Sequence, residues 1–431
     1  MSAQDPAKET SDLRALLEVS RQLGSTIKVQ ELLNLIVQSA LRVLSCERAT
    51  VFLYEREAHE LFSVVAEGAK EIRFSADQGI AGEAARTGQI INVPDAYADQ
   101  RFNRDIDRQT GFHTRNLLTF RLTDFDGKLV GVLQALNKTP EGSCFTDYDE
   151  QLASTLSAQA GVAIQRQILL EAYAIKQKQD RDLELARKIQ QELLPKQNPS
   201  LTGYDIAGWN RPADETGGDC YDFLPLSDGR LGLMLADAVG HGIPAALIIA
   251  QCRASIRAVV SSSPDLPETI ARVNQLLYSD LMPEQFVTAF IGILDPGANR
   301  MTYVSAGQGP LLLYRAADKQ VTQLDATALP LAIIPDAEFE AGDPIDFSPG
   351  DMMVLLTDGF FEWTRAAETR SPYDQFGIDR VIDVIREHDQ KPAREIIGCV
   401  YDAVLRYAAG SAQDDDLTAI VIKKLEVSNE M

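Results

Sequence analysis

A charged helical stretch near the middle of the chain sets its architecture. From Glu171 to Leu194 the sequence is rich in Lys, Gln, Arg, Glu and Leu, and the pattern stops at Pro195, which cannot continue a helix. Because 431 residues exceed what one hydrophobic core usually organises, this stretch predicts a linker between two domains. The predicted parts are an N-terminal helix (1–24), a first domain (25–165), a helical linker (166–197), a second domain (198–425) and a tail (426–431).

Charge and composition exclude several classes of protein. The formal net charge of −22 repels phosphate backbones and anionic lipid headgroups, so neither nucleic acid nor a membrane is an expected partner. No signal peptide or membrane-spanning run is recognisable, and we expect the protein in the cytoplasm. The five cysteines are odd in number and form no CxxC pair, so we expect buried thiols and neither a disulfide framework nor a zinc site.

Two patterns alternate in the first domain. Apolar residues recur at helical spacing over 11–44, which predicts two helices, and another helix is predicted from Thr146 onward. Short apolar runs separated by turn signals such as Asp126-Gly127 predict an antiparallel sheet. The predicted strands are 49–54, 61–66, 116–122 and 128–137.

The second domain has the pattern of antiparallel sheets flanked by helices. Hairpin signals at 227–229 and 295–297 join neighbouring strand-like runs, which favours an α+β fold over a doubly wound parallel sheet. The predicted strands are 231–236, 286–294, 301–305, 311–314, 352–357 and 417–423. The predicted helices are 243–260, 265–280 and a pair within 377–408.

Aspartates recur at the predicted strand ends of the second domain. They are Asp219, Asp237, Asp358 and the run 414–416, and each lies beside a glycine or a turn. A single Asp-Gly pair is usually only a turn, but four such positions favour a site in which carboxylates and backbone carbonyls bind a hard cation. Oxygen ligands alone indicate Mg²⁺ or Mn²⁺.

The order of these motifs resembles the sporulation and stress-response branch of the bacterial PPM serine/threonine protein phosphatases. The segments that carry the resemblance are 185–195 (LARKIQQELLP), 217–222 (GGDCYD), 237–246 (DAVGHGIPAA), 305–307 (SAG), 357–362 (TDGFFE) and 415–418 (DDLT). They extend over roughly the whole second domain. The resemblance implies an antiparallel β-sandwich flanked by helices, with two Mn²⁺ or Mg²⁺ ions at one end.

The same resemblance implies roles for individual residues. Asp219 and Asp237 would bridge the two ions, with the carbonyl of Ala238 nearby, while Asp358 and Asp415 would complete the shell of the second ion. Asp416 is an alternative to Asp415. Paired ions would activate a water for direct in-line hydrolysis, with no side-chain nucleophile. His241 is either a general acid or a structural histidine, and Glu362 contacts either metal-bound water or only the helix start.

The resemblance also implies the substrate. It would be a protein carrying phosphoserine or phosphothreonine, with an anti-sigma-factor antagonist of the STAS type as the expected partner. A catalytically inactive, ligand-sensing scaffold that docks partner proteins is the alternative. Retention of all the carboxylate positions favours the enzyme.

The first domain resembles GAF domains, the small-molecule sensors of phosphodiesterases, cyclases and bacterial signalling proteins. Among the segments that carry the resemblance are 80–82 (IAG), 93–97 (VPDAY), 110–118 (TGFHTRNLL) and 131–134 (GVLQ). A further set matches cyclic-nucleotide-binding members: Asn137, Lys138, Phe145, Asp149 and Glu150. A Lys138–Asp149 ion pair would be a structural lock of the pocket floor. The ligand is a cyclic nucleotide, another small molecule, or none.

The linker carries a short heptad pattern. One register places Ile168, Ile175, Asp182 and Ile189 along one row of the seam and Ala172, Gln179, Ala186 and Leu193 along the other, at alternating spacings of four and three residues. The ends of this seam are apolar and its middle is polar. We expect a coiled-coil homodimer whose weak middle allows two arrangements, and a plain surface helix is the alternative.

Overall fold

The computed structural model describes residues 21, 28–63, 72–260, 265–365 and 374–426. It divides into two units, Met1–Lys178 and Gln179–Met431, and the division falls within the segment predicted as the linker. Each unit has hydrophobic cores of its own. The predicted N-terminal helix 1–24 and the tail lie almost entirely outside the described residues.

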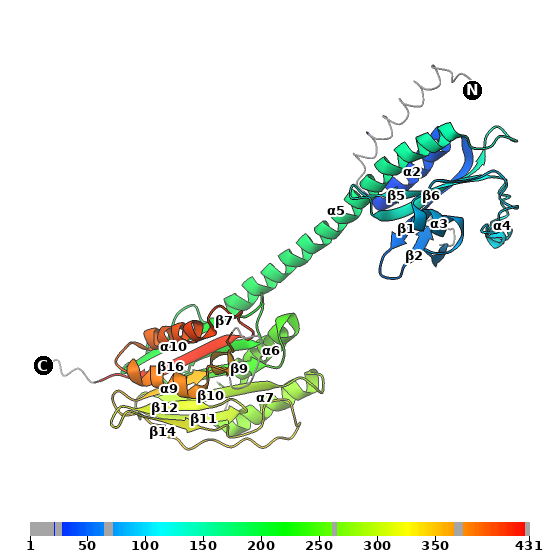
Figure 1. Ribbon diagram of the computed structural model, residues 1–431. Helices are drawn as coiled ribbons and strands as arrows, with labels where there is room; N and C mark the ends of the chain where they lie inside the picture. Colours follow the sequence, from blue (N-terminus) through cyan, green and yellow to red (C-terminus); the bar gives the residue numbers. More distant parts are fainter. Residues whose placement is uncertain (1–20, 22–27, 64–71, 261–264, 366–373, 427–431) are drawn as a thin grey trace. The chain divides into compact units, whose positions relative to one another are not determined.

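The N-terminal unit is built on one six-stranded antiparallel sheet. Its strand order is β3-β2-β1-β6-β5-β4, so β1 and β6 lie at the centre (Figure 1). The strands are β1 (Cys46–Glu55), β2 (Glu60–Ser63), β3 (Arg73–Ser75), β4 (Ile91–Val93), β5 (Leu117–Thr123) and β6 (Leu129–Lys138). The four predicted strands are therefore present, and two short edge strands extend the sheet.

Helices cover both faces of this sheet because its apolar residues alternate. Val51 and Leu53 of β1 pack in the core that includes α2 (Val29–Val43) and the first part of α5 (Asp147–Leu193). Phe52, which lies between them, points to the opposite face and packs with α3 (Gly79–Thr87). A further short helix, α4 (Arg104–Thr110), precedes β5.

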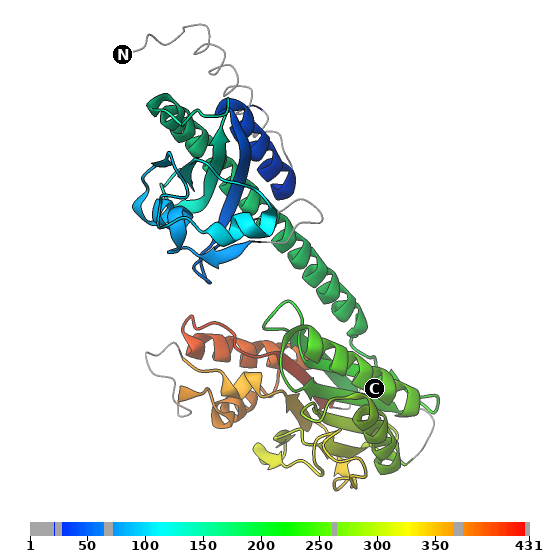
Figure 2. The ribbon, with the colours of Figure 1, turned by 90° about the vertical axis from the view of Figure 1, so that its right-hand side faces the viewer.

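Helix α5 is one continuous helix of 47 residues (Figures 1 and 2). Thr146 caps its N-terminus: the Thr146 hydroxyl accepts the Asp149 backbone amide at 3.4 Å, and the Asp149 carboxylate accepts the Thr146 backbone amide at 2.8 Å. It ends at Leu193, two residues before Pro195, as the sequence predicts. Exposed apolar side chains on this helix include Ile168, Ile175, Leu185 and Ile189.

The C-terminal unit is a sandwich of two five-stranded antiparallel sheets. One sheet has the order β14-β11-β10-β9-β8 and the other has the order β13-β12-β15-β16-β7. The first comprises β8 (Asp219–Pro225), β9 (Leu231–Ala238), β10 (Val287–Asp295), β11 (Arg300–Ala306) and β14 (Ile345–Asp346). The second comprises β7 (Tyr204–Arg211), β12 (Leu311–Arg315), β13 (Gln320–Leu324), β15 (Met352–Leu356) and β16 (Leu417–Lys424).

Three cores hold this unit together. Phe223, Leu233 and Phe290 of one sheet meet Met353 and Ile420 of the other between the sheets. Helices α6 (Gly242–Val260) and α7 (Leu266–Asp280) pack on the outer face of the first sheet. Helices α8 (Gly359–Glu362), α9 (Ile378–Glu387) and α10 (Ala393–Ala408) pack on the outer face of the second. The predicted α+β class and the flanked sandwich are confirmed.

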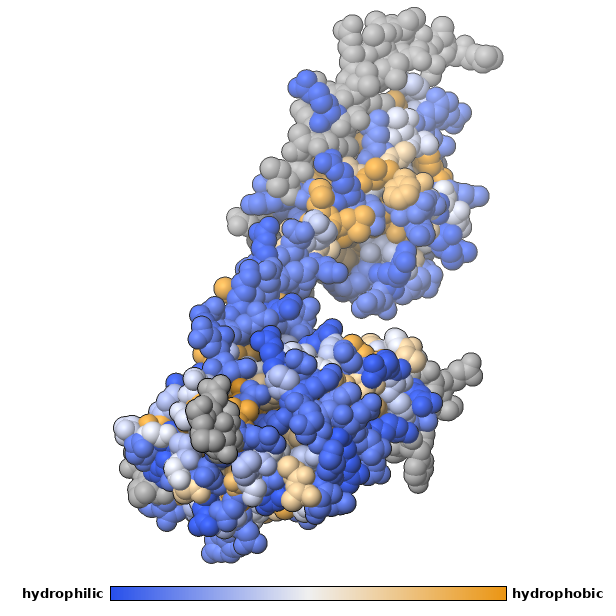
Figure 3. All heavy atoms as spheres, turned by 90° about the vertical axis from the view of Figure 1, so that its left-hand side faces the viewer, coloured by the Kyte–Doolittle hydropathy of each residue, from blue (hydrophilic) through white to orange (hydrophobic). Residues whose placement is uncertain are grey.

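Among the described helices, α6 is the one long and apolar enough to cross a membrane by length and composition. Six of its side chains, including Ile249, Cys252 and Ile256, are buried in the core over β8, β9 and β10. This packing is that of a core helix. On the face of the C-terminal unit that Figure 3 shows, hydrophilic residues predominate.

The cysteines differ from the prediction at two positions. Cys46, Cys220 and Cys252 are buried, but Cys144 is exposed and Cys399 is half-buried. All five are free thiols. Cys144 lies in the short loop before α5, directly before the buried Phe145.

Candidate functional site

The predicted acidic residues meet at one end of the sandwich. Asp219 is the first residue of β8 and lies directly opposite Asp237 of β9 in the antiparallel register. Asp358 follows β15, and Asp415 precedes the neighbouring strand β16. Asp237 lies within β9 and not after it, because the strand continues to Ala238. Both sheets therefore contribute carboxylates to this end.

Two threonines join Asp219 to the opposite sheet. The Asp219 carboxylate accepts hydrogen bonds from the hydroxyl of Thr357 at 2.8 Å and from that of Thr418 at 2.7 Å. Both threonines are buried, and Asp219 itself is only 3% exposed. These bonds use one oxygen, Oδ2, and fix the orientation of the carboxylate.

The two candidate acids of the 414–416 run have different surroundings. The Asp416 carboxylate accepts hydrogen bonds from the backbone amides of Ala213 at 2.7 Å and Asp219 at 3.3 Å, and the residue is 7% exposed. Asp415 is more exposed, and its Oδ1 accepts the backbone amide of Asp416 at 2.8 Å. Both carboxylate oxygens of Asp416 thus accept hydrogen bonds from backbone amides, whereas the Asp415 carboxylate lies near those of Asp358 and Asp237.

The approach of these segments depends on two glycines. A Cβ atom on Gly217 would lie 2.2 Å from Oδ2 of Asp416, and one on Gly218 would lie 2.7 Å from the carbonyl oxygen of Ala238. Neither distance is possible for a real side chain. The Gly218 carbonyl accepts the Ala238 amide at 3.0 Å, so the Ala238 backbone is held beside Asp219.

The carboxylates raise one another's pKa. Burial is the largest cause for Asp219 and Asp237, and the neighbouring carboxylates add to it: Asp237 for Asp219, and Asp358 and Asp415 for Asp237. Burial and Glu362 raise the pKa of Asp358, while burial raises that of Asp415. Four neighbouring carboxyl groups with raised pKa values are all ionised at neutral pH only when positive charge offsets their repulsion.

The donor set suits divalent cations. Carboxylates from both sheets and the Ala238 backbone lie together, and oxygen ligands of this kind bind Mg²⁺ or Mn²⁺. In the described part of the chain, no three Asp, Glu, His or Cys side chains enclose a metal position by themselves. Backbone carbonyls and water would therefore complete any coordination shell.

Two further predicted residues border the cluster. The His241 side chain is 89% exposed, and its Nδ1 lies 3.3 Å from Oδ2 of Asp214. The Glu362 side chain is exposed, and its backbone amide donates to the Asp358 carbonyl at 2.8 Å. His241 therefore pairs with a carboxylate that the sequence did not single out.

Other residues near the site have structural roles. Asp222 is buried and pairs with Arg253, at 2.9 Å, and Arg257 on α6. Thr357 and Thr418 were within the quoted motifs, but nothing in the sequence indicated that they hold Asp219. Their hydrogen bonds join residues 138 and 199 positions apart.

The predicted ion pair between Lys138 and Asp149 is present in the N-terminal unit. Lys138 Nζ lies 2.6 Å from Oδ1 of Asp149, and the two side chains are 12% and 5% exposed. Lys138 also donates to the Leu44 carbonyl at 2.8 Å and lies over the ring of Phe145. This buried pair joins the end of β6 to the start of α5.

The other two residues of that set hold neighbouring loops. The Asn137 side chain accepts the Arg115 amide at 2.7 Å and donates to the His113 carbonyl at 2.9 Å. Glu150 accepts a hydrogen bond from the side-chain amide of Asn92 at 3.0 Å. None of the five predicted residues lines the cavity that lies between the sheet, α3 and α4.

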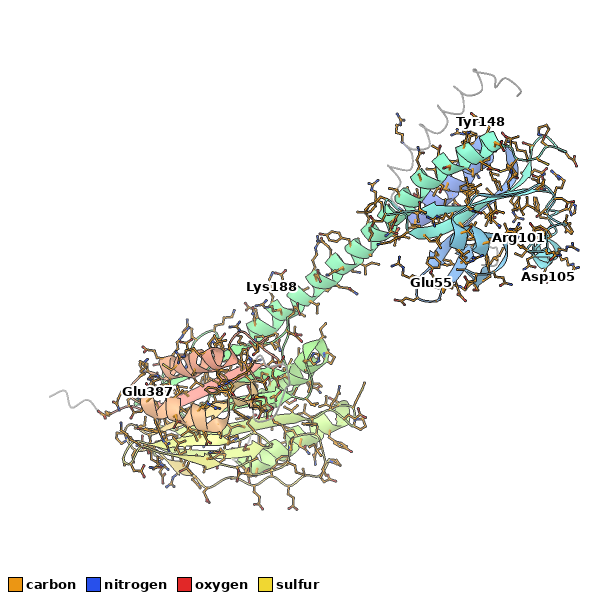
Figure 4. All side chains as sticks on the ribbon, viewed as in Figure 1. Glu55, Arg101, Asp105, Tyr148, Lys188 and Glu387 are labelled. Atoms are coloured by element: carbon orange, nitrogen blue, oxygen red, sulfur yellow. The ribbon has the colours of Figure 1, made fainter. Side chains whose placement is uncertain are left out.

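A cavity of about 260 Å³ lies between the sheet, α3 and α4. Arg101 and Asp105, both labelled in Figure 4, line it. Its apolar lining includes Phe52, Phe74, Ile80, Leu117 and Leu136. Arg101 also pairs with Glu83 at 2.7 Å and with Asp99. Thr114, which lines the cavity, precedes Arg115, so the Asn137 bond supports the cavity wall.

Comparison with protein-family models matches both units. Residues 28–164 match the GAF domain, and residues 227–425 match Stage II sporulation protein E (SpoIIE). The SpoIIE match contains Asp237, Asp358 and Asp415 and begins eight residues after Asp219.

Individual proteins are similar to one part or the other. Phosphoserine phosphatase RsbU of Bacillus subtilis is 28% identical over 254 residues, which are 58% of this chain and 72% of RsbU. Dual 3',5'-cyclic-AMP and -GMP phosphodiesterase 11 of Drosophila melanogaster is 30% identical over 204 residues, but these are 43% of this chain and only 14% of that enzyme.

A solved structure supports the fold of the C-terminal unit. The SiaA-PP2C domain of Pseudomonas aeruginosa matches with a TM-score of 0.51 and 24% identity, over 59% of this chain and 99% of that domain. The flanked β-sandwich, the acidic end and the two family matches agree. The chain is therefore a GAF-domain protein whose C-terminal domain is a PPM-type phosphatase domain of the SpoIIE family.

Proposed function

We propose that the C-terminal domain removes phosphate from phosphoserine or phosphothreonine on a protein, with two Mn²⁺ or Mg²⁺ ions as cofactors. The observation that carries this proposal is the convergence of Asp219, Asp237, Asp358 and Asp415 at one end of the sandwich. The similarity to phosphoserine phosphatase RsbU supports the reaction class.

Each carboxylate has a proposed role. Asp219 and Asp237, with the Ala238 carbonyl beside them, would hold the two ions, and Asp358 and Asp415 would help to hold the second one. We prefer Asp415 to Asp416, because both carboxylate oxygens of Asp416 already accept backbone amides. The Thr357 and Thr418 hydroxyls hold Asp219 in one orientation, which favours metal binding without rearrangement.

When bound, paired divalent cations would lower the pKa of a water and offset the negative charge on the phosphoryl oxygens and on the serine or threonine oxygen that leaves. The protein supplies the frame for this chemistry. Its carboxylates provide four negative charges that balance the charge of the ions. The hydrogen bond from the buried Thr357 fixes the orientation of the Asp219 carboxylate. His241 and Glu362 are both exposed, and we expect a phosphorylated side chain to approach the carboxylates from their side.

The partner and the control of the enzyme are further parts of the proposal. We expect an anti-sigma-factor antagonist of the STAS type as substrate, in the cytoplasm, on the basis of the family resemblance. We expect the GAF domain to control turnover in response to a small molecule. Helix α5 runs without a break from Asp147 to Leu193, and its exposed Ile168, Ile175 and Ile189 suit a coiled-coil homodimer.

Phosphate release from a phosphoserine peptide, with and without Mn²⁺, tests the proposal. We expect turnover with Mn²⁺ and none after chelation by EDTA. Turnover that persists in EDTA would contradict the metal-dependent mechanism. A chain that binds phosphoprotein but releases no phosphate with either ion would instead favour the inactive scaffold.

A further inference from the structure

One side chain of α5 is bound to the segment that carries Asp219. Gln190 Nε2 donates to the Gly217 carbonyl at 2.6 Å, and the Gly217 amide donates to Gln190 Oε1 at 3.0 Å. The side-chain amide thus pairs with both backbone groups of one residue. Gln190 is half-buried, whereas its neighbours Ile189 and Gln191 are exposed.

Gly217 is itself packed against the acidic cluster. Its Cα lies so close to the Asp416 carboxylate that a Cβ atom would be 2.2 Å from Oδ2. The same carboxylate accepts the Asp219 amide. A displacement of Gly217 therefore acts on Asp416 and on Asp219, two residues further along the chain.

The neighbouring residues in this turn of α5 have other surroundings. Lys188, labelled in Figure 4, forms an ion pair with Glu184 of the same helix at 2.8 Å. Gln191 is exposed. Among the described residues of this turn, Gln190 is the one whose side chain is hydrogen-bonded to the Gly217–Asp219 segment, so it links the helix to that segment.

We propose that Gln190 is a positioning residue for the metal centre. By holding Gly217 through two hydrogen bonds, it keeps the Asp219 carboxylate in the geometry that binds divalent cations. The metal affinity of the phosphatase domain then depends on where the end of α5 lies. This inference rests on the proposed metal-dependent function.

Gln190→Ala in the full chain tests the inference, with Gln191→Ala as the matched control. Loss of two hydrogen bonds that orient the segment should weaken Mn²⁺ binding about tenfold by titration calorimetry. The Mn²⁺ concentration for half-maximal phosphate release should rise by the same factor, and turnover at saturating Mn²⁺ should recover. Because Gly217 is buried and loses both partners, the melting temperature in EDTA should fall a few degrees below that of Gln191→Ala, so both titrations are run well below that temperature.

A second variant separates positioning from loss of packing. Gln190→Glu keeps the side-chain length and accepts the Gly217 amide, but it cannot donate to the Gly217 carbonyl. We expect Mn²⁺ affinity below that of the wild type. In both Gln190 variants without metal, amide hydrogen exchange of residues 213–219 should be faster than in Gln191→Ala.

Two results would overturn the inference. One is Gln190→Ala with the Mn²⁺ affinity and exchange rates of the control. The other is a loss of turnover that saturating Mn²⁺ does not restore while affinity is unchanged. A wild-type chain that binds no Mn²⁺ and releases no phosphate would instead reject the proposed function itself.

Discussion

At the scale of single residues, the acidic end of the sandwich combines two kinds of carboxylate. Asp237, Asp358 and Asp415 face one another and have raised pKa values, which is unfavourable unless cations are present. Asp416 and Asp222 are instead bonded to backbone amides or arginines and hold the scaffold. The two kinds should respond differently to substitution.

Replacement of a proposed ligand should abolish activity and leave the fold intact. Asp219→Asn, Asp237→Asn and Asp358→Asn each remove a charge that balances an ion, so we expect phosphate release to fall by at least about 100-fold, equivalent to about 2.7 kcal/mol. The exposed Asp325→Asn serves as a control for the assay. Near-normal turnover of Asp358→Asn at saturating Mn²⁺ would show that the metal assignment is wrong.

Substitutions of the adjacent residues Asp415 and Asp416 should have different effects on metal affinity and on stability. Asp415→Asn should lower Mn²⁺ affinity with little change in unfolding free energy. Asp416→Ala leaves two backbone amides without acceptors, and we expect it to lower the unfolding free energy by about 1–3 kcal/mol. Chemical denaturation in EDTA measures the second effect. If Asp415→Asn is destabilised and Asp416→Ala is not, the roles are reversed.

The raised pKa values predict a pH dependence for the metal-free protein. Burial and the facing carboxylates raise the pKa of Asp237 from 3.8 to about 7, so the fold favours its protonated form. Stability from this group is present at low pH and is lost as pH rises from about 4 through about 7. In EDTA, the melting temperature of Asp237→Asn relative to the wild type should therefore be higher at pH 7.5 than at pH 5.5. An equal difference at both pH values would contradict this.

At the scale of elements, sequence periodicity predicted the regular strands and the long helices. β9, β10 and β16 are apolar runs with turn signals beside them, and α6 and α7 have helical spacing. β8 was missed because it carries two aspartates and is buried on both faces, so it does not alternate. α3 was missed because two glycines in nine residues weaken the helical signal.

The candidate site could be predicted from the sequence only where local patterns mark its residues. The order of Asp219, Asp237, Asp358 and Asp415 was visible in the sequence because each lies beside a turn or strand end. The contacts of Thr357, Thr418 and Gln190 depend on how two sheets and a helix pack, and local patterns carry no information about such distant pairs.

The cavity of the N-terminal unit gives a prediction at this scale. A ligand that enters it should stabilise the GAF domain by mass action, by about 2.7 kcal/mol at a concentration of 100 times its Kd. If the ligand is a cyclic nucleotide, cyclic AMP or cyclic GMP at about 1 mM should raise the melting temperature. Leu136→Arg, which places a charge in the apolar lining, is the matched variant. No shift with either nucleotide would exclude this ligand class.

At the scale of the whole molecule, α5 is the element common to both units. In the predicted heptad register Ile189 and Leu193 are seam positions, while Gln190 falls beside the seam and is bonded to Gly217. One helix can therefore pair with a second copy and hold the Asp219 segment at the same time. Polar Gln179 and Asp182 would make the middle of the seam weak.

A stronger coiled-coil seam should hold the phosphatase activity at one level, whether or not ligand is bound. Gln179→Leu combined with Asp182→Leu makes the repeat apolar throughout, so we expect a tighter dimer and turnover that no longer responds to ligand. Light scattering measures the dimer, and phosphate release measures the response. A monomeric wild-type protein at assay concentration, or a double variant with unchanged regulation, would contradict the coiled-coil switch.

We propose that the carboxylates at the end of the sandwich hold the cations that make this domain a phosphatase. The most direct test measures Mn²⁺ stoichiometry and phosphate release from a phosphoserine peptide on the same preparation, for the wild type and Asp237→Asn. We predict two ions per chain and turnover in the wild type, and loss of both in the variant. Wild-type turnover without bound metal, or an Asp237→Asn chain that keeps both ions and its activity, would contradict the account.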